Sequence, residues 1–260
     1  MPQTAVNTST TAGIAQVRLN RPDVRNAFHA EMIAELHRTF ERLDADSAVR
    51  VIIMSGEGKA FCGGADINWM RASLDLSRDE NFADAQRMSD MFRMVNACSK
   101  PVIARVHGAA LGGGAGLVAV CDIAIASTET VFGFTETKLG ILPAVISPFV
   151  LAKIGKSHAR ALFLTGERFD AGRALAVGLV HEVVATDALD GAVDRIVQEV
   201  LTSSPTAIAL AKRTIAQVAA GTYDDSRETT ARAIAHQRTS VEGQEGLRAF
   251  LERRKAGWTP

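Results

Sequence analysis

Several features that mark common classes of protein are scarce or missing in this sequence. The cysteines, Cys62, Cys98 and Cys121, are odd in number and form no C-x-x-C pair, which argues against a disulfide framework or a zinc site. We expect buried thiols and no metal. No apolar run reaches the roughly 18 residues of a membrane-spanning helix, and the first residues lack the charged-then-apolar order of a signal peptide. We therefore expect a cytoplasmic protein that does not bind membranes.

An excess of charge of either sign is also missing. Lysine plus arginine equals aspartate plus glutamate at 29 each, so the composition offers no basic footprint for nucleic acid. What is abundant is apolar sequence: 47% of the 260 residues are hydrophobic. This is enough for one large domain, or for one domain with an appendage.

Strand and helix patterns alternate up to about residue 185, and only helical patterns follow. Strands are predicted at 13–19, 50–55, 102–106 and from 123, and helices at 29–43, 85–97, from Pro143, from Pro205, at 223–238 and over the last 25 or so residues. The polar stretch 72–84 is predicted to be a surface excursion that could cover a pocket. The division is a mobile polar N-terminus at 1–11, an α/β core at 12–195 and a helical region at 196–260.

The stretch 100–122 contains the most informative turn of the chain. A β-branched strand ends at His107, and a glycine-dense loop with Gly112, Gly113 and Gly114 leads into a helix. The spacing fits neither a dinucleotide fingerprint nor a phosphate-binding P-loop. Glycine lets a backbone approach a ligand closely, and the first amides of a helix are unpaired, so the loop could hold an oxygen with negative charge. Close packing of strand on helix is the alternative without a ligand.

A second glycine-rich loop, GEGKAFCGGADI at 56–67, also follows a strand. Two such corners that face each other could form an oxyanion hole for a thioester or ester carbonyl. The nearby groups that could act as a base are Asp66, His107, Asp122, Glu129 and Glu136. Without further information, Asp66 is best interpreted as a loop-fixing carboxylate, and Cys62 and His107 as structural groups.

Several blocks together resemble the crotonase superfamily, the enoyl-CoA hydratases and isomerases. They are RPDVRNAF at 21–28, FCGGADI at 61–67, VHGAALGGGAG at 106–116, CDIAIAS at 121–127, FGFTETKLGILP at 132–143, LTGERFDAGRALAVGLVHEVV at 164–184 and FLERRKAGW at 250–258. The resemblance implies an α/β fold, a spiral of ββα units, with a C-terminal helical trimerisation region. It also implies a homotrimer or a dimer of trimers, and an acyl-CoA substrate with no separate cofactor.

The resemblance assigns roles to particular residues. The backbone N–H groups of Gly63 and Gly113 correspond to oxyanion-hole donors, and Glu136 corresponds to a catalytic glutamate. The residues implied in substrate or CoA binding are Asp23, Val24 and Arg25 in a turn, Ala65, Asp66 and Ile67 in a loop that reads the adenine through its main chain, Gly112, and Phe250 and Lys255 near a neighbouring subunit's CoA. A second catalytic glutamate of the family is missing here, because Gly116 stands in its place.

One glutamate leaves three hypotheses open. A single carboxylate could take a proton from water and return it to the substrate, as a hydratase requires, or could move a proton within the substrate, as a Δ3,Δ2-enoyl-CoA isomerase requires. The block TETKLGILPAVISPF most resembles bacterial 3-methylglutaconyl-CoA hydratases of leucine degradation. That substrate carries its own carboxylate, for which Arg105, Lys138 and Lys153 are the candidate cations. The third hypothesis is an assembly component that binds CoA without catalysis.

Overall fold

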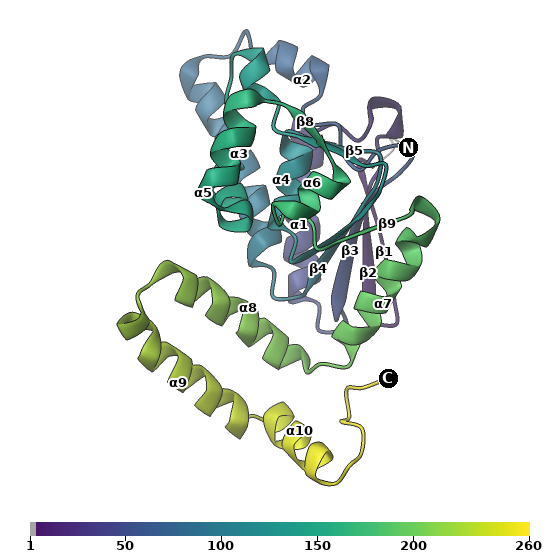
Figure 1. The fold of residues 1–260 in the computed structure, drawn as a ribbon, viewed down its shortest axis with the longest axis vertical. Helices are drawn as coiled ribbons and strands as arrows, with labels where there is room; N and C mark the ends of the chain where they lie inside the picture. Colours follow the sequence, from purple (N-terminus) through teal and green to yellow (C-terminus); the bar gives the residue numbers. More distant parts are fainter. Residues whose placement is uncertain (1–3) are drawn as a thin grey trace.

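Two β-sheets organise the body of the protein, and helices pack against them (Figure 1). The computed structural model describes residues 4–260. The strands are β1 (Val6–Thr11), β2 (Ile14–Leu19), β3 (Val51–Gly56), β4 (Val102–Val106), β5 (Ala109–Leu111), β6 (Ile123–Ser127), β7 (Val131–Gly133), β8 (Arg168–Asp170) and β9 (Glu182–Val184). The helices are α1 (Ala30–Ala45), α2 (Ile67–Ala72), α3 (Arg78–Ala97), α4 (Gly113–Val120), α5 (Ser147–Thr165), α6 (Ala171–Ala176), α7 (Leu189–Leu201), α8 (Pro205–Ala220), α9 (Tyr223–Thr239) and α10 (Val241–Leu251), with short 3-10 helices η1 (Pro22–Val24), η2 (Glu136–Leu139) and η3 (Thr186–Ala188).

The larger sheet has the order β1-β2-β3-β4-β6-β9, and all of its pairs except β1 with β2 are parallel. Its central strands β3 and β4 are buried along almost their whole length, as expected for parallel strands covered on both faces. One face packs against α7 through Val51, Ile53 and Ile103. The other face borders the main core, to which α1, α3, α4 and α5 contribute.

The smaller sheet, β5-β7-β8, places two loops beside each other. Strand β5 pairs with β7, so that the start of α4, just after β5, lies next to the segment that follows β7. An isolated bridge between Cys62 and Ala110 also holds the 56–67 loop against β5. Three segments that are distant in sequence therefore meet at one corner of the body.

Helices α8, α9 and α10 form an arm that lies apart from the sheets (Figure 1). Only Ala249 among the residues of these three helices is buried. Large apolar side chains of the arm are exposed, including Ile215, Tyr223, Val241 and Phe250. The last helix is shorter than predicted, because it ends at Leu251, and the chain then returns to the body.

The predicted mobile N-terminus is wrong where the structure describes it, while residues 1–3 of that prediction lie outside the described residues. Strand β1 pairs with β2 along its whole length, from Val6 with Leu19 to Thr11 with Ile14. Ala12 and Gly13 join the two strands, both with positive φ, as a two-residue hairpin turn requires. The strand is polar because all of it after Val6 is exposed at the sheet edge.

The predicted excursion at 72–84 is largely helical. Helix α2 reaches Ala72, and α3 begins at Arg78 rather than near residue 85. Ser77 and Glu80 form a capping box at this start, a signal that the sequence contains and our prediction missed. The predicted helix at Pro143 is also displaced, because α5 begins at Ser147.

The remaining elements agree with the predicted order, so the α/β class with C-terminal helices is confirmed. Short strands β5, β7 and β8 were not predicted. Three residues give too little alternation for a sequence pattern to distinguish a strand from a loop.

Candidate active site

The corner where the loops meet contains a cavity of about 410 Å³, which we call the glycine-loop cavity. It is bordered by the 63–65 loop, α2, the first half of α3, the start of α4 and the 135–146 segment. The lining is mostly apolar, and it consists of Gly63, Gly64, Ala65, Trp69, Met70, Ser73, Asp84, Ala85, Met88, Leu111, Gly112, Gly113, Thr135, Glu136, Leu139, Ile141, Leu142, Pro143, Ala144, Val145 and Ile146.

The start of α4 supplies an unpaired amide to this cavity. Gly112 has φ 52° and is the N-cap of the helix, a conformation that glycine adopts without strain. The N–H of Gly113, in the first turn, has no acceptor among the described residues. A methyl group placed on Gly113 would lie 2.9 Å from the ring of Phe28 and 3.0 Å from Met88. Only glycine therefore brings this amide to the cavity without displacing its neighbours.

The 63–65 loop supplies a second amide, but not the predicted one. The N–H of Gly63 donates to the carbonyl oxygen of Arg25 at 2.7 Å, which contradicts its assignment as a free donor. Phe28 donates to Gly64 and accepts from Asp66. In a parallel β-bridge, the residue between these two hydrogen bonds directs its own N–H away from the partner segment, here away from Phe28.

That residue is Ala65, whose N–H has no acceptor within residues 4–260. Ala65 also lines the cavity. Ala65 and Gly113 therefore offer the pair of free amides that the sequence analysis assigned to Gly63 and Gly113. The Gly63 N–H is occupied by the carbonyl oxygen of Arg25, 38 residues earlier in the chain. A local sequence pattern does not reveal such a contact.

Glu136, the first residue of η2, holds its carboxylate in the same cavity. A methyl group placed on Gly112 would lie 3.1 Å from Glu136 Oε1, so the carboxylate lies directly over the N-cap of α4. Glu136 Oε2 is the one buried side-chain nitrogen or oxygen without a hydrogen-bond partner in residues 4–260. Burial raises the pKa of this carboxyl above its ordinary value, and the hydrogen bond from its own backbone N–H offsets only part of the rise.

A buried carboxyl oxygen without a partner costs free energy, and carboxyl groups with a shifted pKa concentrate at functional sites. A carboxyl group whose pKa is raised is better suited than an ordinary one to accept and return a proton. The cavity thus combines one acid/base group with two amides that could hold a developing negative charge.

The other polar groups that the sequence singled out have structural partners. Asp66 caps α2 and pairs with Arg21 at 2.8 Å; burial acts to raise its pKa, but the hydrogen bonds from Arg21 and two backbone amides outweigh this and lower it. Burial raises the pKa of the Cys62 thiol to about 12. His107 is bonded through its ring to Gly58 and Arg105. These contacts support their interpretation as structural groups.

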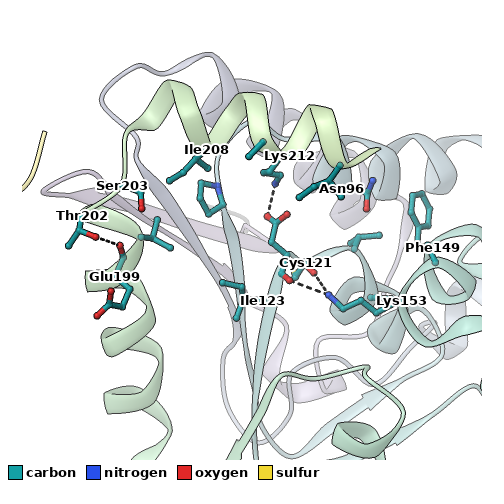
Figure 2. Close-up of a pocket in the computed structure, with 18 residues that line it drawn as sticks. Asn96, Cys121, Ile123, Phe149, Lys153, Glu199, Thr202, Ser203, Ile208 and Lys212 are labelled. Atoms are coloured by element: carbon teal, nitrogen blue, oxygen red, sulfur yellow. Dashed lines mark hydrogen bonds and ion pairs between the residues drawn. The ribbon is translucent and has the colours of Figure 1, made fainter. Parts of the chain in front are cut away.

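The candidate cations for an acidic acyl tail lie elsewhere. Arg105 pairs with Asp190, and Lys138 does not line the cavity. Lys153 donates to the backbone oxygens of Cys121 and Asp122 in a different cavity, the α8 groove, between α8 and the body (Figure 2). Within the described chain, the charged residues that line the glycine-loop cavity are Asp84 and Glu136, both acidic.

The residues implied in CoA binding are arranged in two groups. Asp23, Val24 and Arg25 form an exposed turn at η1, beside the 63–65 loop through the Arg25–Gly63 bond, and Ile67 is 70% exposed. Phe250 is 80% exposed at the end of α10, and Lys255 donates to the carbonyl oxygen of Pro260. Neither lines the glycine-loop cavity of its own chain.

The described residues lack two features that would point to other kinds of function. Between residues 4 and 260 there is no group of three or more His, Cys, Asp or Glu side chains that could hold a metal ion. Nor does that part of the chain contain a helix long and apolar enough to cross a membrane.

Comparison with known proteins agrees with this geometry. Residues 9–260 match the sequence model of a family described as enoyl-CoA hydratase/isomerase. A putative enoyl-CoA hydratase of Thermus thermophilus is 33% identical over 241 residues, which cover 93% of this chain and 95% of that protein.

Solved structures give the same result. A crystal structure of an enoyl-CoA hydratase from Shewanella pealeana is 37% identical with a TM-score of 0.94, covering 98% of this chain and 96% of that chain. Pseudomonas aeruginosa AtuE is 34% identical with a TM-score of 0.96, covering 98% of this chain and 100% of that chain. The fold is therefore that of the crotonase structures, and the chain belongs to the enoyl-CoA hydratase/isomerase family of enzymes.

Proposed function

We propose that this enzyme adds water to the double bond of a 2-enoyl-CoA thioester, with Glu136 as its one acid/base group and the amides of Ala65 and Gly113 as its oxyanion hole. The observation that carries the proposal is the buried Oε2 of Glu136, which has no hydrogen-bond partner in residues 4–260, beside the two free amides. This replaces Gly63 of the sequence analysis by Ala65 and keeps Gly113 and Glu136.

The proposed reaction has two proton transfers. The thioester oxygen accepts hydrogen bonds from Ala65 and Gly113, which stabilise the negative charge as it grows. Glu136 takes a proton from water while the oxygen of that water bonds to C3, and the electron pair of the double bond moves into an enolate. The Glu136 carboxylic acid then donates its proton to C2. The glutamate ends as it began, so no cofactor is needed beyond the CoA of the substrate.

The pocket lining favours a neutral acyl group. An acidic tail such as that of 3-methylglutaconyl-CoA would enter a cavity whose charged residues, among those described, are Asp84 and Glu136. Like charges repel strongly where screening is poor. The 3-methylglutaconyl substrate and a place in leucine degradation stay predictions, and they require a cation from outside this lining.

Isomerisation of a 3-enoyl-CoA is the second candidate. It needs one base that removes a proton from C2 and returns it to C4, and the apolar surroundings of Gly116 favour such a single-base site. We also infer that the arm forms subunit contacts in a trimer or a dimer of trimers, where Phe250 and Lys255 would meet a neighbouring subunit's CoA. The exposed apolar residues of α8–α10 support this. Cytoplasmic location stays a prediction.

A turnover assay separates these functions. Purified enzyme would be given crotonyl-CoA, 3-methylglutaconyl-CoA and a 3-enoyl-CoA, with products identified by mass, and each assay would be repeated with Glu136→Gln. We expect one water to be added to crotonyl-CoA, and this activity to be lost in the variant. A shifted double bond without a gain in mass would instead identify an isomerase, and turnover that survives Glu136→Gln would refute the single-glutamate mechanism.

A further inference from the structure

Ile146 fills the space into which a side chain at position 116 would project. A methyl group placed on Gly116 would lie 2.3 Å from Ile146 Cγ2 and 3.0 Å from Ile146 Cβ, and 3.3 Å from the ring of Phe92. Separations under 3.0 Å essentially never occur for real Cβ atoms. Ile146 is buried with 2% exposure, immediately before α5. Position 116 therefore cannot carry any side chain while Ile146 keeps its place.

The same isoleucine is part of the cavity wall. Gly113 and Gly116 are three residues apart on α4, so they share one face of the helix. Gly113 lines the cavity directly, whereas at the position of Gly116 the lining residue is Ile146. Ile146 thus lies between α4 and the cavity, one turn along the helix from the N-cap that Glu136 covers.

The side chains next to Gly116 in this wall are apolar. Ile146 and Met88 line it, and Phe92 packs behind them. A water molecule needs about two to four polar partners to be held in a cavity. Ile146, Met88 and Phe92 offer no hydrogen bond to the water that attacks the substrate, so polar groups elsewhere in the lining, such as Glu136 and Asp84, must hold that water.

We propose that Ile146 is a specificity-determining residue. It excludes both a second side chain and water from this part of the cavity wall, and it thereby lowers the ratio of hydrated to isomerised product. The inference rests on the proposed function of Glu136 and deepens it. Gly116 and Ile146 act as a pair: the glycine makes room, and the isoleucine occupies it.

A double-mutant cycle on thermal stability tests whether Ile146 sterically blocks position 116, and it requires no activity assay. Gly116→Ala would be made in the wild-type, Ile146→Val and Ile146→Ala backgrounds, and Tm measured for each. Valine retains both γ carbons, including the one that blocks position 116, whereas alanine removes them. We expect Gly116→Ala to lower Tm in the first two backgrounds and to cost clearly less in Ile146→Ala. An equal loss of Tm in all three would overturn the proposal.

Product partition tests the chemical part. With a 3-enoyl-CoA as substrate, the ratio of hydrated to isomerised product would be measured for wild type, Ile146→Val, Ile146→Ala and the double variant Gly116→Glu/Ile146→Ala. We expect the ratio to stay near wild type with valine, to rise with alanine, and to rise about tenfold or more in the double variant, which adds a second acid/base group. A ratio that is the same in all four proteins would overturn the role of Ile146 in reaction choice.

The two failures can be told apart. If Glu136→Gln leaves turnover intact, the proposed function fails while the stability cycle can still show the 116/146 pairing. If Glu136→Gln abolishes turnover but the product ratio does not respond to position 146, the proposed function stands and this inference falls.

Discussion

The glycine-loop cavity and the α8 groove differ in how their charged groups are partnered. The α8 groove is the larger, at about 700 Å³ against about 410 Å³. In the groove, Lys212 pairs with Asp122, and Lys153 donates to two backbone oxygens (Figure 2). In the smaller cavity, Glu136 has a buried carboxylate oxygen without any partner in residues 4–260.

The unpartnered oxygen of Glu136, and not the volume of the cavity, is the reason that we propose the smaller cavity as the reactive site. The two lysines of the groove have hydrogen-bond acceptors, the Asp122 carboxylate and the backbone oxygens of Cys121 and Asp122. Such satisfied contacts are typical of residues that stabilise the packing of a helix against the body of a protein. Glu136 Oε2 has no such partner in residues 4–260, as expected for the acid/base group that we propose. Changes at Glu136 should therefore affect turnover, and changes in the groove should affect stability.

The largest expected effect is that of Glu136→Gln on turnover. Loss of the acid/base group should lower kcat by about 10²- to 10⁴-fold, with acyl-CoA binding retained, because glutamine keeps the shape. Steady-state kinetics and calorimetric binding of a non-reactive thioester would measure the two effects. The matched control is Glu129→Gln, an exposed glutamate outside the cavity, which should behave as wild type.

The free amide is tested by replacing one backbone N–H with an ester oxygen. Lactic acid incorporated at position 65 should lower kcat by about 10²- to 10³-fold, as expected for the loss of one oxyanion donor. Glycolic acid at position 63 removes the N–H that donates to Arg25 and should mainly lower Tm. If the ester at 63 had the larger effect on kcat, the original assignment of Gly63 would be correct and ours wrong.

Lys212→Met tests the expectation that the α8 groove contributes to stability and not to turnover. Among residues 4–260 it leaves Asp122, whose side chain is 30% exposed, with the Val102 amide as its one donor. The substitution should lower stability by about 1–3 kcal/mol without changing kcat. Urea unfolding would measure the loss. Arg232→Met on α9 breaks an exposed ion pair and should cost roughly 0–1 kcal/mol. A fall in kcat with Lys212→Met would contradict a purely structural groove.

The smallest expected effect is on the pH dependence of stability. Because the pKa of Glu136 is raised in the folded protein, its ionisation opposes folding: the stability associated with its protonated form is present below the ordinary carboxyl pKa and is lost as pH rises through the folded value. Glu136→Gln should therefore raise Tm by ~1–3 °C at pH 7, with the gain disappearing at low pH. Calorimetry across pH 4–8 would measure it, and a gain independent of pH would point to packing instead.

Much of the site could be predicted because its signals are local. The glycine triplet before α4 and Glu136 after β7 were both identified from motifs, as was the absence of a carboxylate at Gly116. The start of α3 is also marked by a local signal, the capping box of Ser77 and Glu80, although our prediction overlooked it. Strand β1 was missed because its polar residues match an edge strand and a loop equally well.

Local patterns in the sequence indicate most of the helices and the longer core strands in their order, the two glycine-rich loops and Glu136. The three-dimensional structure was needed to find that Ala65 rather than Gly63 offers a free amide, because the Gly63 N–H donates to the carbonyl oxygen of Arg25. Only the tertiary structure, too, placed Ile146 against Gly116 and the candidate cations away from the cavity. The physical reason is that a hydrogen bond or a steric contact depends on which distant groups share a space, and the spacing of residues along a chain does not contain that information.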